Sequence, residues 1–108
     1  MRGFRHAHWD RAIEEDVDFF ETYAAFTNAY WDPPFERHLD RKTHALIAMV
    51  LFASQGIEAT LPAHIRRALG LGATREEILE AFEAAVIPVG APTLYRGIKA
   101  LMELDEEG

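Results

Sequence analysis

One stretch of the chain limits its possible folds more than any other feature. Every residue from Ala45 to Ala53 is apolar, and the stretch lies between a polar segment near Asp40 and the glycine at position 56. A membrane-crossing helix needs about 20 such residues, so this stretch is too short to span a bilayer. We therefore expect a helix that begins near Leu39 or Asp40, where Asp40 can act as the N-cap, ends at Gly56 and is buried on all sides.

A helix buried on all sides is difficult to arrange in a chain of 108 residues, which is long enough for one domain only. Contacts with further copies of the same chain would cover the sides that its own helices leave open. The apolar stretch therefore favours a homo-oligomer. We expect residues 1–108 to form a single domain within each copy.

The preceding and following segments also have the apolar spacing of helices. From Asp10 to Tyr30 apolar residues recur about every 3.6 residues, the aspartate is a suitable N-cap, and two successive prolines end the helix. A third helix follows Thr60 and carries Pro62 in its first turn, where the missing N–H costs nothing. It is expected to end at Gly70 or Gly72.

The fourth helix begins with a capping box, Thr74-Arg75-Glu76-Glu77, in which hydroxyl and carboxylate cap each other's backbone N–H. Pro88 and Gly90 break this helix, and a last helix begins at about Pro92. The residues expected to face inward on these last three helices are Leu61, Ile65, Ala68, Leu69, Ile78, Phe82, Ala85, Val86, Leu94, Ile98, Leu101 and Met102. Since no stretch shows sustained strand alternation, the predicted fold class is all-α, with about five helices.

Charge and composition exclude several classes of function. Asp and Glu number 18 against 11 Lys and Arg, giving a net charge of -7, so the chain repels phosphate backbones and nucleic-acid binding is not expected. The basic N-terminus is not followed by a hydrophobic signal core, and without cysteine no disulfide can form, so we expect a cytoplasmic protein. The lack of cysteine also excludes a thiolate nucleophile and a zinc–thiolate site.

Histidine is the remaining candidate for chemistry. His6 and His8 are interpreted as solvated residues of the N-terminal segment, and since no His-Glu-x-x-His spacing occurs, no metal site is expected. His64 lies about 70° from the centre of the apolar stripe of the third helix, at the edge of the buried face. Arg67 lies on the same flank, so imidazole and guanidinium can converge on one anionic ligand. The alternative is a partly buried histidine bonded to a backbone carbonyl, and His44 leaves the same two alternatives open.

Several segments between Leu39 and Leu101 resemble the carboxymuconolactone decarboxylase family, which includes the alkylhydroperoxidase D-like proteins. The matching residues are Leu39-Asp40-Arg41-Lys42-Thr43, Leu46-Ile47-Ala48, His64 with Arg67-Ala68-Leu69, Gly72-Ala73-Thr74-Arg75-Glu76-Glu77-Ile78 and Gly90-Ala91-Pro92. The aromatic residues of the N-terminal helix (residues 10–30), followed by Trp31, resemble those of small stand-alone members.

The resemblance implies an alkylhydroperoxidase D-like helical bundle that assembles as a homotrimer or homohexamer. It also implies that His64 stands at the position of the family's active-site histidine. The two cysteines of the peroxidase branch correspond to Ile57 and Thr60, and its relay glutamate corresponds to Ala45, so cysteine peroxidase activity is excluded. The decarboxylase branch has a glutamate where this chain has Thr60 and a tyrosine where it has Pro88.

Two hypotheses follow. In the first, the protein is a lyase that needs no cofactor: Arg67 or Arg41 binds a small carboxylated or lactone metabolite, and His64, with His44, moves a proton. His64 would then line a polar cavity between the second and third helices. In the second, the protein is a diverged homo-oligomeric binding or interaction protein on the same scaffold, because a fold does not carry its function with it.

Overall fold

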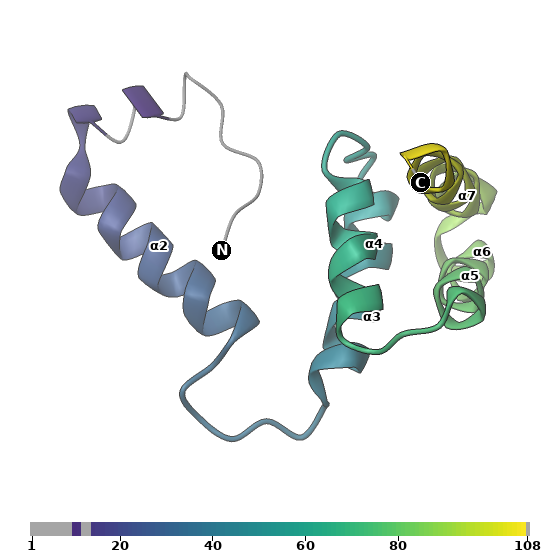
Figure 1. The fold of residues 1–108 in the computed structure, drawn as a ribbon, viewed down its shortest axis with the longest axis horizontal. Coiled ribbons are helices and arrows are strands. Elements are labelled where there is room, and N and C mark those ends of the chain that lie inside the picture. The colour runs from purple at the N-terminus through teal and green to yellow at the C-terminus, as the bar shows by residue number, and fades with distance from the viewer. Residues whose placement is uncertain (1–9, 12–13, 108) are drawn as a thin grey trace. The chain divides into compact units, whose positions relative to one another are not determined.

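In the computed structural model, the described residues are 10–11 and 14–107, and all regular structure among them is helical (Figure 1). Five helices have ten residues or more. This confirms the predicted all-α class. The chain forms two compact units, which divide between His38 and Leu39.

The N-terminal unit contains α2 (Val17–Trp31). Residues 10–11 and 14–15 are also helical, but Asp16 interrupts the helix with φ -146° and caps α2 by accepting a hydrogen bond from the Phe19 N–H at 3.2 Å. The predicted unbroken helix from Asp10 to Tyr30 is therefore wrong at its start. A second aspartate, six residues after the first, competes for the role of N-cap because its side chain bonds the backbone outside a helix. The predicted end is confirmed, since α2 stops before the prolines.

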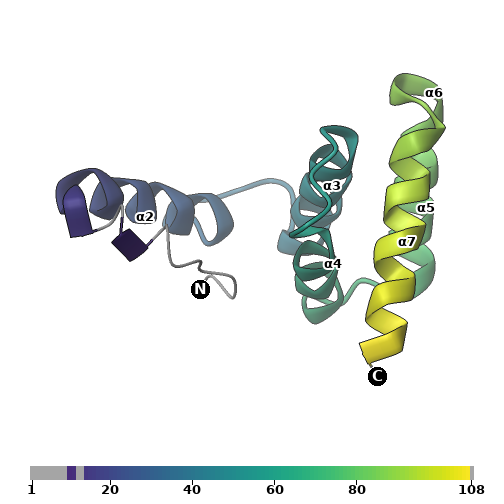
Figure 2. The same ribbon diagram turned by 90° about the horizontal axis from the view of Figure 1, so that it is seen from above.

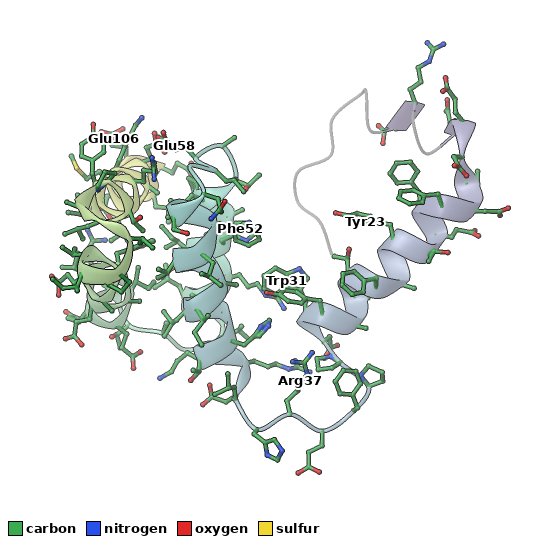
Figure 3. The ribbon with its side chains drawn as sticks, turned by 180° about the vertical axis from the view of Figure 1, so that it is seen from behind. Tyr23, Trp31, Arg37, Phe52, Glu58 and Glu106 are labelled. Carbon is green, nitrogen blue, oxygen red and sulfur yellow. The ribbon has the colours of Figure 1, made fainter. Side chains whose placement is uncertain are left out.

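One face of α2 is aromatic. Four exposed aromatic residues, spaced four, three and four apart, lie on the same side of the helix. They are Phe19, Tyr23, Phe26 and Tyr30. The rings of Phe19 and Tyr23 stack at 6.5 Å, and α2 has no buried residue. Figure 3 labels Tyr23 and Trp31 on this helix.

The C-terminal unit is a bundle of helices. Its elements are α3 (Arg41–Ser54), α4 (Leu61–Gly70), α5 (Arg75–Ala84), α6 (Val86–Val89) and α7 (Ala91–Glu107). The helices α3 and α4 lie side by side, as do α5 and α7, and α7 also packs against both α3 and α4 (Figure 2). The core of this unit is formed by Ala45, Met49, Ala53, Leu61, Ile65, Ala68, Ala73, Ile78, Phe82, Ala100 and Leu101.

Two predicted N-caps are confirmed in this unit. The Asp40 side chain accepts a hydrogen bond from the Thr43 N–H at 2.7 Å at the start of α3. At the start of α5 the Thr74 hydroxyl accepts from the Glu77 N–H at 3.0 Å, and the Glu77 carboxylate accepts from the Thr74 N–H at 2.9 Å. Glu77 also forms an ion pair with Lys42 at 3.0 Å, which joins α5 to the first turn of α3.

Within the C-terminal unit, the apolar stretch of α3 is covered on one side only. Ala45, Ala48, Met49 and Ala53 are buried, but Ile47 is 46% exposed and Leu51 is 58% exposed. The prediction of a helix buried on all sides is therefore wrong within the C-terminal unit. The physical reason is that α4, α5 and α7 contact α3 while only the face with Ala45, Ala48, Met49 and Ala53 is buried.

The inward face of α7 also differs from the prediction. Ile98 and Met102 are exposed, as is Leu69 on α4, whereas Thr93, Gly97, Ala100 and Leu101 are buried on α7. Gly97 determines this orientation, because without a side chain it lets the Phe82 ring of α5 lie directly on the α7 backbone. A pattern of apolar side chains cannot predict this contact, because glycine has no side chain to appear in it.

The break between α5 and α7 contains a short helix that the sequence did not predict. α6 includes Pro88, which lies in the first turn, where a backbone N–H has no partner within the helix. Gly90 then ends α6 with φ 93°, a value that side chains disfavour. Gly90 therefore separates α6 from α7, whereas α5 itself already ends at Ala84, before either residue.

Candidate functional site

The candidate site is built on the turn between α3 and α4. Gly56, with φ 78°, reverses the chain after α3. The turn is fastened to α7 by Arg96, whose guanidinium donates to the Ala53 carbonyl at 2.8 Å. Lys99 forms an ion pair with Glu58 at 3.2 Å one helical turn further along α7. These two contacts with α7 hold the C-terminal end of α3 and the start of α4 in a fixed position relative to each other.

His64 lies in the first half of α4 and is half-buried. Its imidazole stacks on the ring of Phe52 from α3, with 4.0 Å between the ring centroids and 11° between the planes. Burial lowers the pKa of His64 below its ordinary value, and the positive charge of Arg67 lowers this pKa further. The imidazole is therefore uncharged at neutral pH and can accept a proton.

Arg67 lies one turn after His64 on α4, as the spacing predicts, and its Nε atom is buried. Its positive charge lies close enough to His64 to lower the pKa of the imidazole. A guanidinium beside an uncharged imidazole can bind the carboxylate of a ligand while the imidazole exchanges a proton with it.

The other two candidate residues lie at the opposite end of α3. Arg41 is the first residue of that helix and is exposed, and His44 is partly buried three residues later. His44 precedes Phe52 by eight residues, which corresponds to about 12 Å of helix rise. The structure thus brings His64 together with Arg67, while His44 and Arg41 occupy the other end of the hairpin.

Phe52 is the site residue that the sequence analysis missed. The apolar pattern places it only within the apolar stretch of α3, although its distance from the turn carries a usable signal. The predicted break at Gly56 and the predicted start of α4 after Thr60 define a helical hairpin. Residues equally distant from the middle of such a turn face each other, and position 58 is equally distant from Phe52 and His64.

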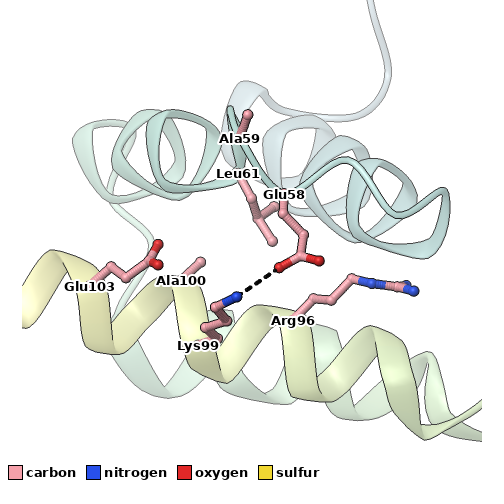
Figure 4. Close-up of a pocket in the computed structure, with 7 residues that line it drawn as sticks. All are labelled: Glu58, Ala59, Leu61, Arg96, Lys99, Ala100 and Glu103. Carbon is pink, nitrogen blue, oxygen red and sulfur yellow. Dashed lines mark hydrogen bonds and ion pairs between the residues drawn. The ribbon is translucent and has the colours of Figure 1, made fainter.

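A cavity of about 320 Å³ lies between the α3–α4 turn and α7, as Figure 4 shows. It is lined by Glu58, Ala59, Leu61, Arg96, Lys99, Ala100 and Glu103. None of the four sequence-predicted residues lines this cavity. A polar cavity beside His64 therefore remains a prediction.

The structure also bears on metal binding and on membrane crossing. Among the described residues, no group of three or more His, Cys, Asp or Glu side chains is placed to bind a metal ion. His6 and His8 lie outside those residues. In the same part of the chain, no helix combines the length and apolar character that crossing a membrane requires.

Comparison with known proteins identifies the scaffold. A model of the carboxymuconolactone decarboxylase family matches residues 18–103, from α2 to near the end of α7. The chain belongs to this family. The chain is also similar to an uncharacterized protein of Methanocaldococcus jannaschii, with 26% identity over 84 residues, which are 78% of either chain. No solved structure matches the chain.

The segment that matches the carboxymuconolactone decarboxylase family includes all four candidate residues, which are Arg41, His44, His64 and Arg67. The match also includes positions 57 and 60, which hold isoleucine and threonine. The family assignment therefore agrees with the resemblance found in the sequence, including the absence of the cysteine pair.

The lowered pKa of His64 makes a prediction about stability. Between the ordinary pKa of 6.5 and the lower folded value, the unfolded chain binds a proton that the folded chain does not bind. The free energy of unfolding should therefore fall as the pH drops through 6.5. Unfolding in denaturant at about pH 7.5 and about pH 5.5 should show a larger loss for the wild type than for His64→Gln. The other histidines are common to both proteins, so equal losses would contradict the assignment.

Proposed function

We propose that this protein is a lyase that removes carbon dioxide from a small carboxylated lactone, with His64 as the proton-transfer group and Arg67 as the anion-binding group. The observation that carries the proposal is the half-buried, uncharged imidazole of His64 beside the guanidinium of Arg67. Membership of the carboxymuconolactone decarboxylase family supports this substrate class.

The reaction can be written with the residues of this chain. The bond between the carboxylate carbon and the lactone carbon breaks, carbon dioxide leaves, and the electron pair moves into the conjugated lactone carbonyl. Arg67 holds the substrate by pairing with its negative charge. His64 is uncharged in the free protein, and the nearby carboxylate of the bound substrate raises the pKa of the imidazole so that it takes up a proton. The imidazolium then protonates the lactone carbon, and solvent restores its proton.

Ligand binding and turnover test the proposal directly. Carboxymuconolactone should raise the melting temperature of the purified protein, because a ligand at 100 times its Kd adds about 2.7 kcal/mol to stability. The same mixture should release carbon dioxide. An uncharged lactone of similar size is the control, and it should stabilise the protein less because it offers no carboxylate to Arg67. If carboxymuconolactone causes no stabilisation and no release of carbon dioxide, the proposal is refuted.

A second candidate function is favoured by the residues at two positions of the decarboxylase branch. Thr60 replaces a glutamate there and only begins α4, with no side-chain capping bond, and Pro88 replaces a tyrosine and is exposed. A chain that has lost these groups fits a binding or interaction protein on the same scaffold. Ligand stabilisation without release of carbon dioxide would favour this function. In either case we expect no dithiol-dependent reduction of peroxides, because no thiolate is present.

Assembly of several copies is part of the proposal. Ile47 and Leu51 lie one turn apart on the uncovered side of α3, and the aromatic face of α2 is exposed as well. Burial of these surfaces between copies removes apolar area from water, as stable interfaces above about 1,000 Å² do. Family membership and this surface together favour the homotrimer or homohexamer predicted from the sequence.

Light scattering measures this assembly. The purified wild type should have the mass of three or six chains at micromolar concentration. Leu51→Glu should lower that mass, because it places a charge in the apolar interface. A wild type with the mass of one chain would contradict the proposal.

A further inference from the structure

The contact between Phe52 and His64 is built by two different helices. The rings lie nearly parallel, 4.0 Å apart at their centroids and 11° apart in plane. Phe52 belongs to the last turn of α3, and His64 belongs to the first half of α4. The contact therefore depends on the hairpin and not on local helix geometry.

The contact with Phe52 covers the face of the His64 imidazole and not its edge. Both ring nitrogens lie at the edge of the imidazole, and a ring stacked on its face occupies neither of them. The contact instead limits the side-chain torsions, because other staggered rotamers would carry the imidazole away from Phe52. Proton transfer requires the donor and acceptor atoms within hydrogen-bond distance and aligned, so a fixed ring plane favours it.

The backbone that carries Phe52 is held at several points. The Phe52 carbonyl accepts from the Ile57 N–H at 3.1 Å, and the Ala53 carbonyl accepts from the Gly56 N–H at 3.0 Å. The Arg96 side chain, from α7, donates to the same Ala53 carbonyl at 2.8 Å. Phe52 is thus a rigid surface under a side chain that could otherwise rotate.

We propose that Phe52 is a positioning residue, which fixes the ring plane and rotamer of His64 for proton transfer. This inference rests on the proposed function for its role in catalysis. The stacking itself can be tested without any ligand.

The first measurement is made by NMR on the ligand-free protein. Ring current from Phe52 should shift the carbon-bound imidazole protons of His64 upfield, and three-bond couplings should report a single χ1 rotamer. Phe52→Leu should lose the upfield shift and show averaged couplings, while Phe52→Tyr should keep both wild-type features. Phe35→Leu makes the same change at a 57% exposed phenylalanine and should leave His64 unchanged.

The second measurement is the release of carbon dioxide from carboxymuconolactone. Phe52→Leu should lower kcat by about 10-fold to 100-fold with little change in KM, since misplacement of a reacting group affects the chemical step. Phe52→Tyr should have the kcat of the wild type. Melting temperatures will show whether each variant is folded. Should Phe52→Leu fail to fold, the ring-current shift and the χ1 couplings of the wild type still test the stacking.

Each outcome decides one of the two proposals. A wild type without the upfield shift, or a Phe52→Leu protein with a single χ1 rotamer, overturns the positioning role whether or not the protein is a lyase. A folded Phe52→Leu protein with unchanged kcat also overturns it. A wild type that releases no carbon dioxide refutes the proposed function instead, and the NMR couplings alone then decide whether Phe52 fixes His64.

Discussion

Replacing His64 with alanine is expected to slow the release of carbon dioxide from carboxymuconolactone by about 10²-fold to 10⁴-fold, which is the usual contribution of a positioned proton-transfer group. The imidazole is half-buried at the edge of the core, so its removal should leave the fold largely intact. Unchanged helicity by circular dichroism would show this. The effect should appear mainly in kcat, because the proton moves only after the substrate has bound.

Arg67 and Arg66 supply the comparison that separates binding from proton transfer. Arg67→Ala should mainly raise KM for the carboxylated ligand, and Arg67→Lys should restore it only in part, because an ammonium cannot reproduce the two-pronged donor of guanidinium. Arg66 is the control, since it lies next in sequence, is exposed and pairs with Glu107 on α7. Arg66→Ala should therefore leave KM unchanged. A His64→Ala protein with wild-type turnover would show that another residue transfers the proton.

Local features of the fold were predictable because their chemistry is contained in a few residues. The Asp40 cap and the Thr74–Glu77 capping box each depend on a side chain and a backbone group three positions away. The start of α2 was not predictable in this way. Asp10 and Asp16 are both suitable caps, and the choice between them depends on how much helix each would retain.

Burial was less predictable than helix position. The apolar pattern of α3 correctly predicts a helix, but it does not determine whether its neighbours cover one side or all sides, and Leu51 lies on the uncovered side. Coverage depends on contacts between distant segments and, in the proposed assembly, on copies of the chain. The sequence therefore predicted the need for burial without predicting which surface supplies it.

The candidate site was half predictable for the same reason. His64 and Arg67 are three residues apart on one helix, so helical phase alone predicts that they share a flank. The stacking of Phe52 on His64 joins two helices, and it requires the geometry of the turn at Gly56. His44 and Arg41 precede the same turn, but they lie too far along α3 to face His64 in the same way.

Substituting alanine for Gly97 is expected to destabilise the C-terminal unit, although alanine is normally the better helix former. In the middle of an exposed helix this change stabilises by up to about 1 kcal/mol. Here the new Cβ would lie 2.4 Å from the Phe82 ring, well inside van der Waals contact, and Phe82 is fully buried. Overpacking of this kind costs about 1–3 kcal/mol, so the steric term exceeds the helix-propensity term. The unfolding free energy in denaturant should therefore fall.

A control glycine and a second substitution make this expectation specific to the contact between α7 and α5. Gly70 ends α4, and a Cβ added there would meet no atom within 4 Å, so Gly70→Ala should be neutral or stabilising. Phe82→Leu alone costs stability by leaving a cavity, but it makes room for the new methyl group. The two costs should not add: Gly97→Ala in the Phe82→Leu background should be milder by about 0.5–3 kcal/mol than in the wild type. Additive losses would show that Gly97 is needed for some reason other than the approach of this ring.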